Sequence, residues 1–476
     1  MIRSWKNRAA PVNRVPPEIL ALIPDFWDRH YDGRDHDLVA LTHVCQAWRE
    51  VFTSRPSLWT DLDCEDEGQA HVYLKRSKSL PVNLSLRTED RSLSYHPFFD
   101  IIPHAIGRLI SLSIAATPRD LKGITDHLTR PAPLLKKLSI HGDYYNEPHR
   151  SPALTPALFN GDLSSLRKLR LESVRTELPW RNMVNLTSFK LYYSGTTTRQ
   201  LLDFFESAPR LREIDLHSAT ATSGAQNGQL VSLVWLERMD ITGGGSASHL
   251  LDHMLIPVGT RMMIDVDLPS PPINHQPPRF FDNLRNLPNF TEIELWSGLG
   301  PYFYMKFRGP NGQVRMNPSD KTSLALEALD QFDTSKTEQL EIGHGKSPSG
   351  DSPYRALLPM KHLRTLTLYQ FASSRIFVHA LHPDMSSSGI TVCPKLEKLS
   401  IEHPEEALDL KDVIGMAAAR ASRGAKLKFV RITQGSCMRT DALELKKHAL
   451  HVECGPEFDG ADGDGEGDGD STSGGD

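Results

Sequence analysis

Residues 166–171, Leu-Arg-Lys-Leu-Arg-Leu, show the pattern that decides the fold of this chain. The first, fourth and sixth positions are apolar, and the fourth and sixth share one face of a strand because successive side chains alternate. Clear copies of the pattern begin at Leu109, Leu135, Leu166, Leu186, Leu211, Leu236, Phe290, Leu363, Leu396 and Leu427, and weaker copies at Met262 and Leu340. A chain of 476 residues with this pattern is expected to contain a repeat array and not one ordinary core.

Apolar stripes between the strands predict helices. Their members are Leu121, Ile124 and Leu128; Leu201, Leu202 and Phe205; Leu250, Leu251, Met254 and Leu255; Phe280, Phe281, Leu284 and Leu287; and Ile376, Phe377, Ala380 and Leu381. A proline follows each stripe and is expected to end its helix. Successive early copies begin 20 to 31 residues apart, which resembles the spacing of leucine-rich repeats. The resemblance implies an α/β solenoid with parallel strands inside and helices outside, made irregular because the asparagine that usually follows each strand is missing.

The N-terminal residues 11–62 carry a second pattern, that of short helices. Two prolines open the apolar run at residues 18–23, and proline suits a first helical turn. Pro24 is expected to end or kink this helix. A second helix is expected over residues 37–52, ended by Pro56. Helices this short bury little surface by themselves, so the module is expected to lean on a partner or on the next domain.

These helices resemble an F-box. Residues 15–20, Val-Pro-Pro-Glu-Ile-Leu, resemble its Leu-Pro-x-Glu-Ile opening, and residues 44–48, Val-Cys-Gln-Ala-Trp, resemble the Val-Cys-x-x-Trp end of its second helix. Residues 55–62 and 72–77 are similar to the segment that follows the F-box in many large fungal families. The resemblance covers about residues 11–86, and the polar stretch between the two motifs is longer than usual in that family.

The resemblance implies a partner and no chemistry. An F-box protein binds a Skp-type adaptor, which joins it to a cullin and a RING subunit, and it recognises the protein substrate of that ubiquitin ligase. The residues that the resemblance places at the adaptor are Pro16, Glu18, Ile19, Leu20, Ile23, Leu41, Val44, Cys45 and Trp48. The alternative is a helical cap on the solenoid, in a protein–protein interaction scaffold without a ubiquitin-ligase role.

Four segments are expected along the chain. Residues 11–62 form the F-box-like helical domain, residues 63–104 a linker or solenoid cap, and residues 105–454 the leucine-rich-repeat-like solenoid. Residues 455–476, rich in glycine and aspartate, are expected to form a disordered acidic tail because they contain almost nothing to bury.

Composition excludes several classes of partner. The net charge is −5, and residues 457–476 hold eight acids and no Lys or Arg. The remainder is therefore close to neutral, so no nucleic acid is expected as a ligand. Five scattered cysteines without a Cys-x-x-Cys indicate free thiols in a reducing compartment, the cytoplasm or the nucleus. No apolar run reaches the length of a membrane span, so no membrane partner is expected.

Motifs for catalysis are weak. Gly343–Ser347 resembles the end of a phosphate-binding loop, but position 340 is leucine where that loop needs glycine. The histidines and cysteines lack zinc-site spacing. We therefore expect no enzyme, no cofactor and no metal. Polar residues along the strands, such as Arg170, Lys190, Asp215 and Glu294, are expected to line a solvated face, the best place for a target protein to bind.

The acidic tail yields the first testable prediction. A chain that ends at Gly455 should melt within about 1 °C of the full chain, because residues 457–476 contain almost nothing to bury. Thermal unfolding of the two proteins side by side measures this difference. A loss of several degrees would contradict the prediction and show that the tail packs on the body.

Overall fold

The computed structural model describes residues 11–26, 34–64, 67–88, 98–142, 153–154, 158–176, 183–218, 220–221, 230–243, 249–257, 259–268, 290–297, 303–310, 312–318, 326, 329, 332–343, 352–369, 374–384, 390–403, 408–433 and 439–454. The chain is mixed α/β, with a large and mostly parallel sheet. It divides into two compact units. The N-terminal unit comprises Met1–Leu287 and Asn311–Ser319, and the C-terminal unit comprises Pro288–Pro310 and Asp320–Asp476.

The N-terminal unit opens with short helices, at the position where the sequence predicts them. They are η1 (Pro11–Arg14), α2 (Pro17–Leu20), η2 (Ile23–Phe26), α3 (Arg34–Val44), α4 (Gln46–Thr53) and η3 (Pro56–Trp59). Two expectations were wrong. The helix expected over residues 37–52 is two helices, because Cys45 is extended, with φ −160° and ψ 174°. The first helix ends at Leu20 and not at Pro24, which instead lies in the first turn of η2, where its missing N–H costs nothing.

In the main sheet, ten strands among the described residues of the N-terminal unit pair in parallel. Their order in the sheet is β1 (Asp61–Asp63), β2 (Val82–Arg87), β3 (Leu109–Ala116), β4 (Lys137–Gly142), β6 (Lys168–Glu172), β8 (Ser188–Tyr192), β10 (Glu213–His217), β13 (Arg238–Gly243), β15 (Arg261–Leu268) and β18 (Gly312–Pro318). Equivalent apolar positions of the sequence pattern are register partners, as in Leu138–Leu169–Phe189. These side chains are buried, so the predicted strands and their register are confirmed.

The parallel sheet extends beyond the copies of the pattern in two places. Residues 63–104, expected to be a linker or cap, contain β2, whose Val82, Leu84 and Leu86 alternate with exposed residues and are buried. At the other edge, β18 pairs with β15. Gly312 begins β18 with a φ of 133°, and a Cβ there would lie 2.0 Å from the carbonyl oxygen of Met262. Only glycine allows this close approach of the two strands.

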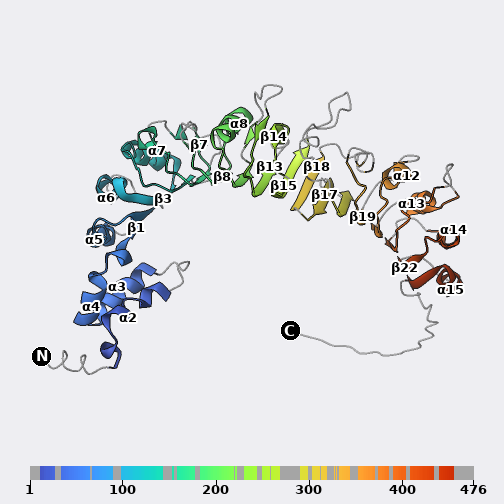
Figure 1. The fold of residues 1–476 in the computed structure, drawn as a ribbon, viewed down its shortest axis with the longest axis horizontal. Coiled ribbons are helices and arrows are strands. Elements are labelled where there is room, and N and C mark those ends of the chain that lie inside the picture. Colours follow the sequence, from blue (N-terminus) through green and yellow to red (C-terminus); the bar gives the residue numbers. More distant parts are fainter. Residues whose placement is uncertain are drawn as a thin grey trace, which may run out of the picture. The chain divides into compact units, whose positions relative to one another are not determined.

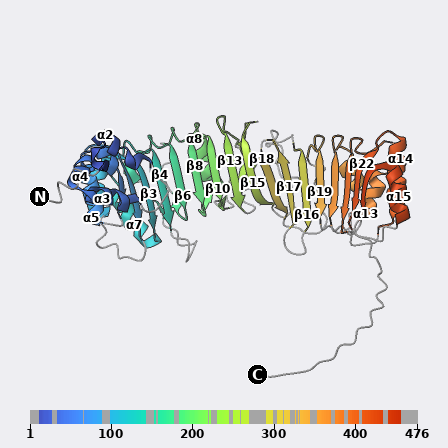
Figure 2. The ribbon, with the colours of Figure 1, turned by 90° about the horizontal axis from the view of Figure 1, so that it is seen from below.

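The helices that connect strands of the main sheet in the N-terminal unit lie on one side of these strands (Figures 1 and 2). They are α5 (Glu67–Arg76), α6 (Phe98–Ala105) with η5 (Ile106–Arg108), α7 (Pro118–His127) and α8 (Thr198–Ser207). The N-cap of α7 is Thr117, whose side chain accepts from the amide of Asp120. A capping box between Thr197 and Gln200 opens α8. Both helices were predicted from their apolar stripes, and their stripe residues are buried.

Smaller elements fill the other connections. They are η7 (Leu158–Gly161) and the strand pairs β5 (Ala153–Leu154) with β7 (Arg175–Thr176), β9 (Thr196–Thr197) with β11 (Thr220–Ala221), and β12 (Val231–Ser232) with β14 (Met254–Leu255). The helix expected over Leu250–Leu255 was therefore wrong in its second half, which is strand β14. The stripe at residues 280–287 and the tail at residues 455–476 lie outside the described residues.

The C-terminal unit has seven strands among its described residues. They are β17 (Phe303–Gly309), β16 (Glu292–Ser297), β19 (Gln339–Gly343), β20 (Thr365–Tyr369), β21 (Lys398–Glu402), β22 (Leu427–Ile432) and β23 (Ala449–Cys454). Only the β16–β17 pair among them is antiparallel. The weaker copy of the pattern at Leu340 is confirmed as β19. Parallel strands alone were expected, and this was wrong at β17. That strand has a simple alternation in which Met305 and Phe307 are buried, and it lacks the six-residue pattern from which the parallel strands were predicted.

Four helices accompany these strands in the described residues: α12 (Ser352–Leu357), α13 (Ser374–Leu381), α14 (Leu410–Ser422) and α15 (Arg439–His448). The apolar stripe at residues 376–381 is confirmed as α13. On α14 the guanidinium of Arg420 is fully buried and donates to the carbonyl oxygens of Val392 and Cys393, at 2.8 and 2.7 Å. These bonds fix the loop before β21 against α14, because the buried carbonyl groups would otherwise lack partners.

The buried strand positions predict a large cost for charge. Leu169→Asp places an unpaired carboxylate at a side chain that is 1% exposed, and it should lower the free energy of unfolding by several kcal/mol, on the order of 4. Chemical denaturation checks this value. Lys168→Asp, at the exposed neighbouring position, is the control and should unfold like the natural chain. Equal stability of the two variants would show that the register is not the one described.

Candidate docking surfaces

A small core holds the N-terminal helices together. Leu20 of α2 packs with Trp48 and Phe52 of α4, and the rings of Trp48 and Phe52 meet edge to face with centroids 5.7 Å apart. Further side chains that pack on this core are Val15, Ile23, Leu41, Cys45, Val51 and Leu58. The core therefore draws on α2, α3 and α4 and on the segments on either side of them, and it sets the positions of the side chains that remain outside.

Trp59 joins these helices to α5, the next helix of the chain. It is fully buried, and its indole N–H donates to the carbonyl oxygen of Phe52 at 3.0 Å. The ring meets Tyr73 of α5 edge to face at 4.8 Å, and the guanidinium of Arg76 lies over it at 4.3 Å. The helical module thus leans on the next part of the chain, as its small size requires.

The structure divides the nine predicted adaptor residues into three groups. Leu20 and Trp48 belong to the internal core, with 4% and 7% of their surface exposed. Ile23, Leu41 and Cys45 are partly buried against that core. Pro16, Glu18, Ile19 and Val44 are exposed. Only the last group is exposed to a partner.

Four large apolar side chains of this module face solvent. Ile19 and Val44 are 53% and 51% exposed, and Val12 and Leu22 are also exposed. Val12 and Leu22 are not among the nine predicted adaptor residues. Apolar character alone does not show which side of a helix as short as α2 is buried. The sequence therefore contains no signal that Leu20 is buried while Ile19 is exposed.

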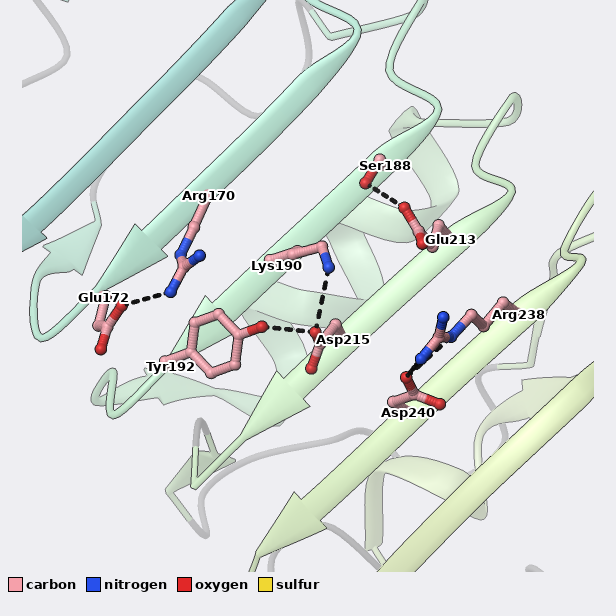
Figure 3. Close-up of polar contacts among 9 residues, drawn as sticks. All are labelled: Arg170, Glu172, Ser188, Lys190, Tyr192, Glu213, Asp215, Arg238 and Asp240. Atoms are coloured by element: carbon pink, nitrogen blue, oxygen red, sulfur yellow. Dashed lines mark hydrogen bonds and ion pairs between the residues drawn. The ribbon is translucent and has the colours of Figure 1, made fainter. Parts of the chain in front are cut away.

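A second surface is the strand face that the helices of the N-terminal unit leave uncovered. Figure 3 shows charged and polar side chains that interact across and along neighbouring strands. Arg170 pairs with Glu172 at 3.0 Å, Lys190 with Asp215 at 3.4 Å, and Arg238 with Asp240 at 2.6 Å. Ser188 donates to Glu213 at 2.7 Å. Arg170, Lys190 and Asp215 were expected on this face, and the structure brings them together.

Tyr192 lies in the middle of this network. Its hydroxyl donates to Asp215 at 2.5 Å, and the guanidinium of Arg170 lies over its ring at 5.0 Å. Burial, and then the hydrogen bond to Asp215, raise the pKa of Tyr192 above its ordinary value. The phenol therefore stays neutral and acts as a hydrogen-bond donor, which suits recognition and not proton transfer near neutral pH.

The strand face of the C-terminal unit is also polar. Glu294 accepts from Arg308 at 2.8 Å and lies beside Glu341, its register partner on β19. Burial, then the charges of Glu294 and Glu402, raise the pKa of Glu341. The ring of Trp296 covers Gly343, where a Cβ would approach it to 2.9 Å. The Lys-Ser part of the loop-like motif after Gly343 lies outside the described residues.

Two buried cysteines are the first candidates for reactive groups in the described residues. Burial raises the pKa of the Cys64 and Cys393 thiols to about 12, so both stay protonated. No group of three or more His, Cys, Asp or Glu there could hold a metal ion. No described helix is both long enough and apolar enough to cross a membrane. A scan against models of known protein families found no match for this chain, and a search of curated proteins found no relative.

Glu341 provides a prediction about pH. Its folded-state pKa is raised, so its contribution to stability is present at low pH and falls as the pH rises through its titration range. Glu341→Gln removes that effect and should raise the melting temperature at pH 7 by roughly 1 to 2 °C, since like charges on neighbouring strands cost a few tenths of a kcal/mol. The gain should vanish near pH 4, where the natural carboxyl is protonated.

The control is Glu338→Gln, which removes the same charge from an exposed position one residue before β19. It should change the melting temperature little at either pH. A gain from Glu341→Gln that is the same at both values of pH would show that the carboxylate charge is not its cause.

Proposed function

We propose that this protein is the substrate-recognition subunit of a Skp–cullin–F-box ubiquitin ligase. In this proposal the N-terminal helices are an F-box that docks on a Skp-type adaptor. The parallel strands and their helices are an irregular leucine-rich-repeat solenoid, and its strand face holds the target protein. The chain performs no chemistry itself. It raises the concentration of the target near the conjugating enzyme, as linked binding modules do.

The exposure of Ile19 and Val44 is the observation that carries this proposal. Both belong to the motifs that resemble the F-box, yet both lie outside a core that Leu20, Trp48 and Phe52 already complete. A helical cap that served only the next domain would turn such side chains inward, because exposed apolar surface brings no stability. The contact that the module makes with the next part of the chain runs through Trp59 and leaves Ile19 and Val44 exposed.

The polar strand face supports the second half of the proposal. Its side chains are held by ion pairs and hydrogen bonds between neighbouring strands, so they are ordered before a partner binds. Preorganised side chains lose less entropy on binding. A scaffold that binds partners without promoting ubiquitination would use the same face, and association with a cullin separates the two functions.

Adaptor binding is tested by charging the exposed pair. Ile19→Asp with Val44→Asp should weaken co-purification of a Skp-type adaptor by on the order of a hundredfold or more, since interface anchors contribute about 2 kcal/mol each. Thermal unfolding should change little because both side chains are exposed. Leu20→Asp would not give a clean test, since it disrupts the internal core.

Leu443→Asp with Leu450→Asp is the matched control, because both side chains are exposed apolar residues of the C-terminal unit. This control should recover adaptor and cullin in the natural amount. Equal recovery from the natural chain and the Ile19, Val44 variant, or recovery from neither, would remove the ubiquitin-ligase function. Recovery of adaptor without cullin would favour the scaffold.

A further inference from the structure

Two neighbouring copies of the sequence pattern differ from the others in charge. Between its first and second apolar residues each copy has two positions, which are polar in most copies, and in several copies they carry opposite charges, as in Arg212–Glu213 and Glu237–Arg238. In the copies of β4 and β6 both positions are basic, Lys136–Lys137 and Arg167–Lys168. We call these four residues the basic strip.

The basic strip is continuous across the two strands. Lys137 and Lys168 are register partners, so their backbones lie about 4.8 Å apart. The amides of Arg167 and Lys168 both donate to the carbonyl oxygen of Lys136, at 2.8 and 2.9 Å. All four side chains are exposed. Four positive charges thus lie at the start of two adjacent strands.

Cations at equivalent positions in two other copies of the pattern have acidic partners. Arg212 pairs with Glu237 at 3.0 Å, and Arg238 with Asp240 at 2.6 Å. No side chain of the basic strip makes an ion pair or a hydrogen bond with any described residue. Like charges that face each other across strands are destabilising. The fold therefore gains nothing from this arrangement, and an external anion would remove its cost.

We propose that the basic strip binds an acidic segment of a partner protein, through its Asp and Glu side chains. This inference rests on the target-binding half of the proposed function and names the chemistry of the target. Charge complementarity selects the occupant. An extended peptide advances about 3.3 Å per residue, so alternate carboxylates can reach cations on neighbouring strands. Nucleic acid fits less well, because its regularly spaced phosphates would continue beyond the strip towards Glu172, Glu213 and Asp215, whereas a peptide can confine its few carboxylates to the strip.

The experiment measures fluorescence anisotropy of a labelled peptide of alternating glutamate and serine, titrated with the full chain. A peptide with glutamine in place of glutamate is the first control. Lys137→Glu with Lys168→Glu should weaken binding of the acidic peptide by about tenfold or more, since each charge-assisted contact is strong. Lys122→Glu with Arg130→Glu changes the net charge equally, at exposed residues on and just after α7, and should leave binding within about twofold.

The single variant Lys168→Glu separates binding from folding. It places a carboxylate opposite Lys137, so the melting temperature should stay equal or rise while peptide binding weakens. The proposal is overturned if the natural chain does not bind the acidic peptide, or if both double variants lose binding equally. It is also overturned if the single variant loses peptide binding only because it unfolds. Tighter binding of duplex DNA than of the peptide, lost in the same variants, overturns it in favour of nucleic acid. Co-purification of the adaptor is unaffected by these changes, so the two proposals fail separately.

Discussion

Each strand of the parallel array must bury every second side chain against the helices, and this requirement governs the rest of the structure. Leu169 and Leu171 of β6 are buried, and so are their register partners on the strands to either side. A slip of one residue would turn every apolar side chain of a strand to solvent, so the register is strongly specified. The side chains between the buried ones are left on the opposite face, where the fold places little demand on their identity.

That freedom explains why the exposed strand face is the part of the molecule that can differ from repeat to repeat. Arg170, Lys190 and Asp240 occupy equivalent positions on three strands, with three different interactions. Surface ion pairs of this kind contribute about 0 to 1 kcal/mol each, whereas a buried leucine contributes several times more. Replacing them changes recognition far more than stability. The proposed target-binding role fits this division between a buried face that fixes the fold and an exposed face that varies.

The sequence predicted the repeated elements well, because each copy of the pattern supplies independent evidence for the same register. Strands at every clear copy, and helices α7, α8 and α13, follow from apolar spacing alone. Elements that occur once were missed. The break at Cys45 depends on one extended residue, and β17 follows a simple alternation that short segments share with many loops. Of the candidate site, the nine predicted residues lie on or directly beside the N-terminal helices, but the burial of Leu20 and the exposure of its neighbour Ile19 follow only from the packing of α2 on α4.

Packing of the module explains how a small group of helices can be stable and still present apolar surface. Trp59 is buried between Phe52 and Tyr73, so part of the stability of the module comes from its packing on α5. The internal core of Leu20, Trp48 and Phe52 is then complete without Ile19 and Val44. A module that needed those two side chains for its own core could not offer them to another protein. Anchoring through Trp59 is therefore the condition under which the N-terminal helices can serve as a docking module at all.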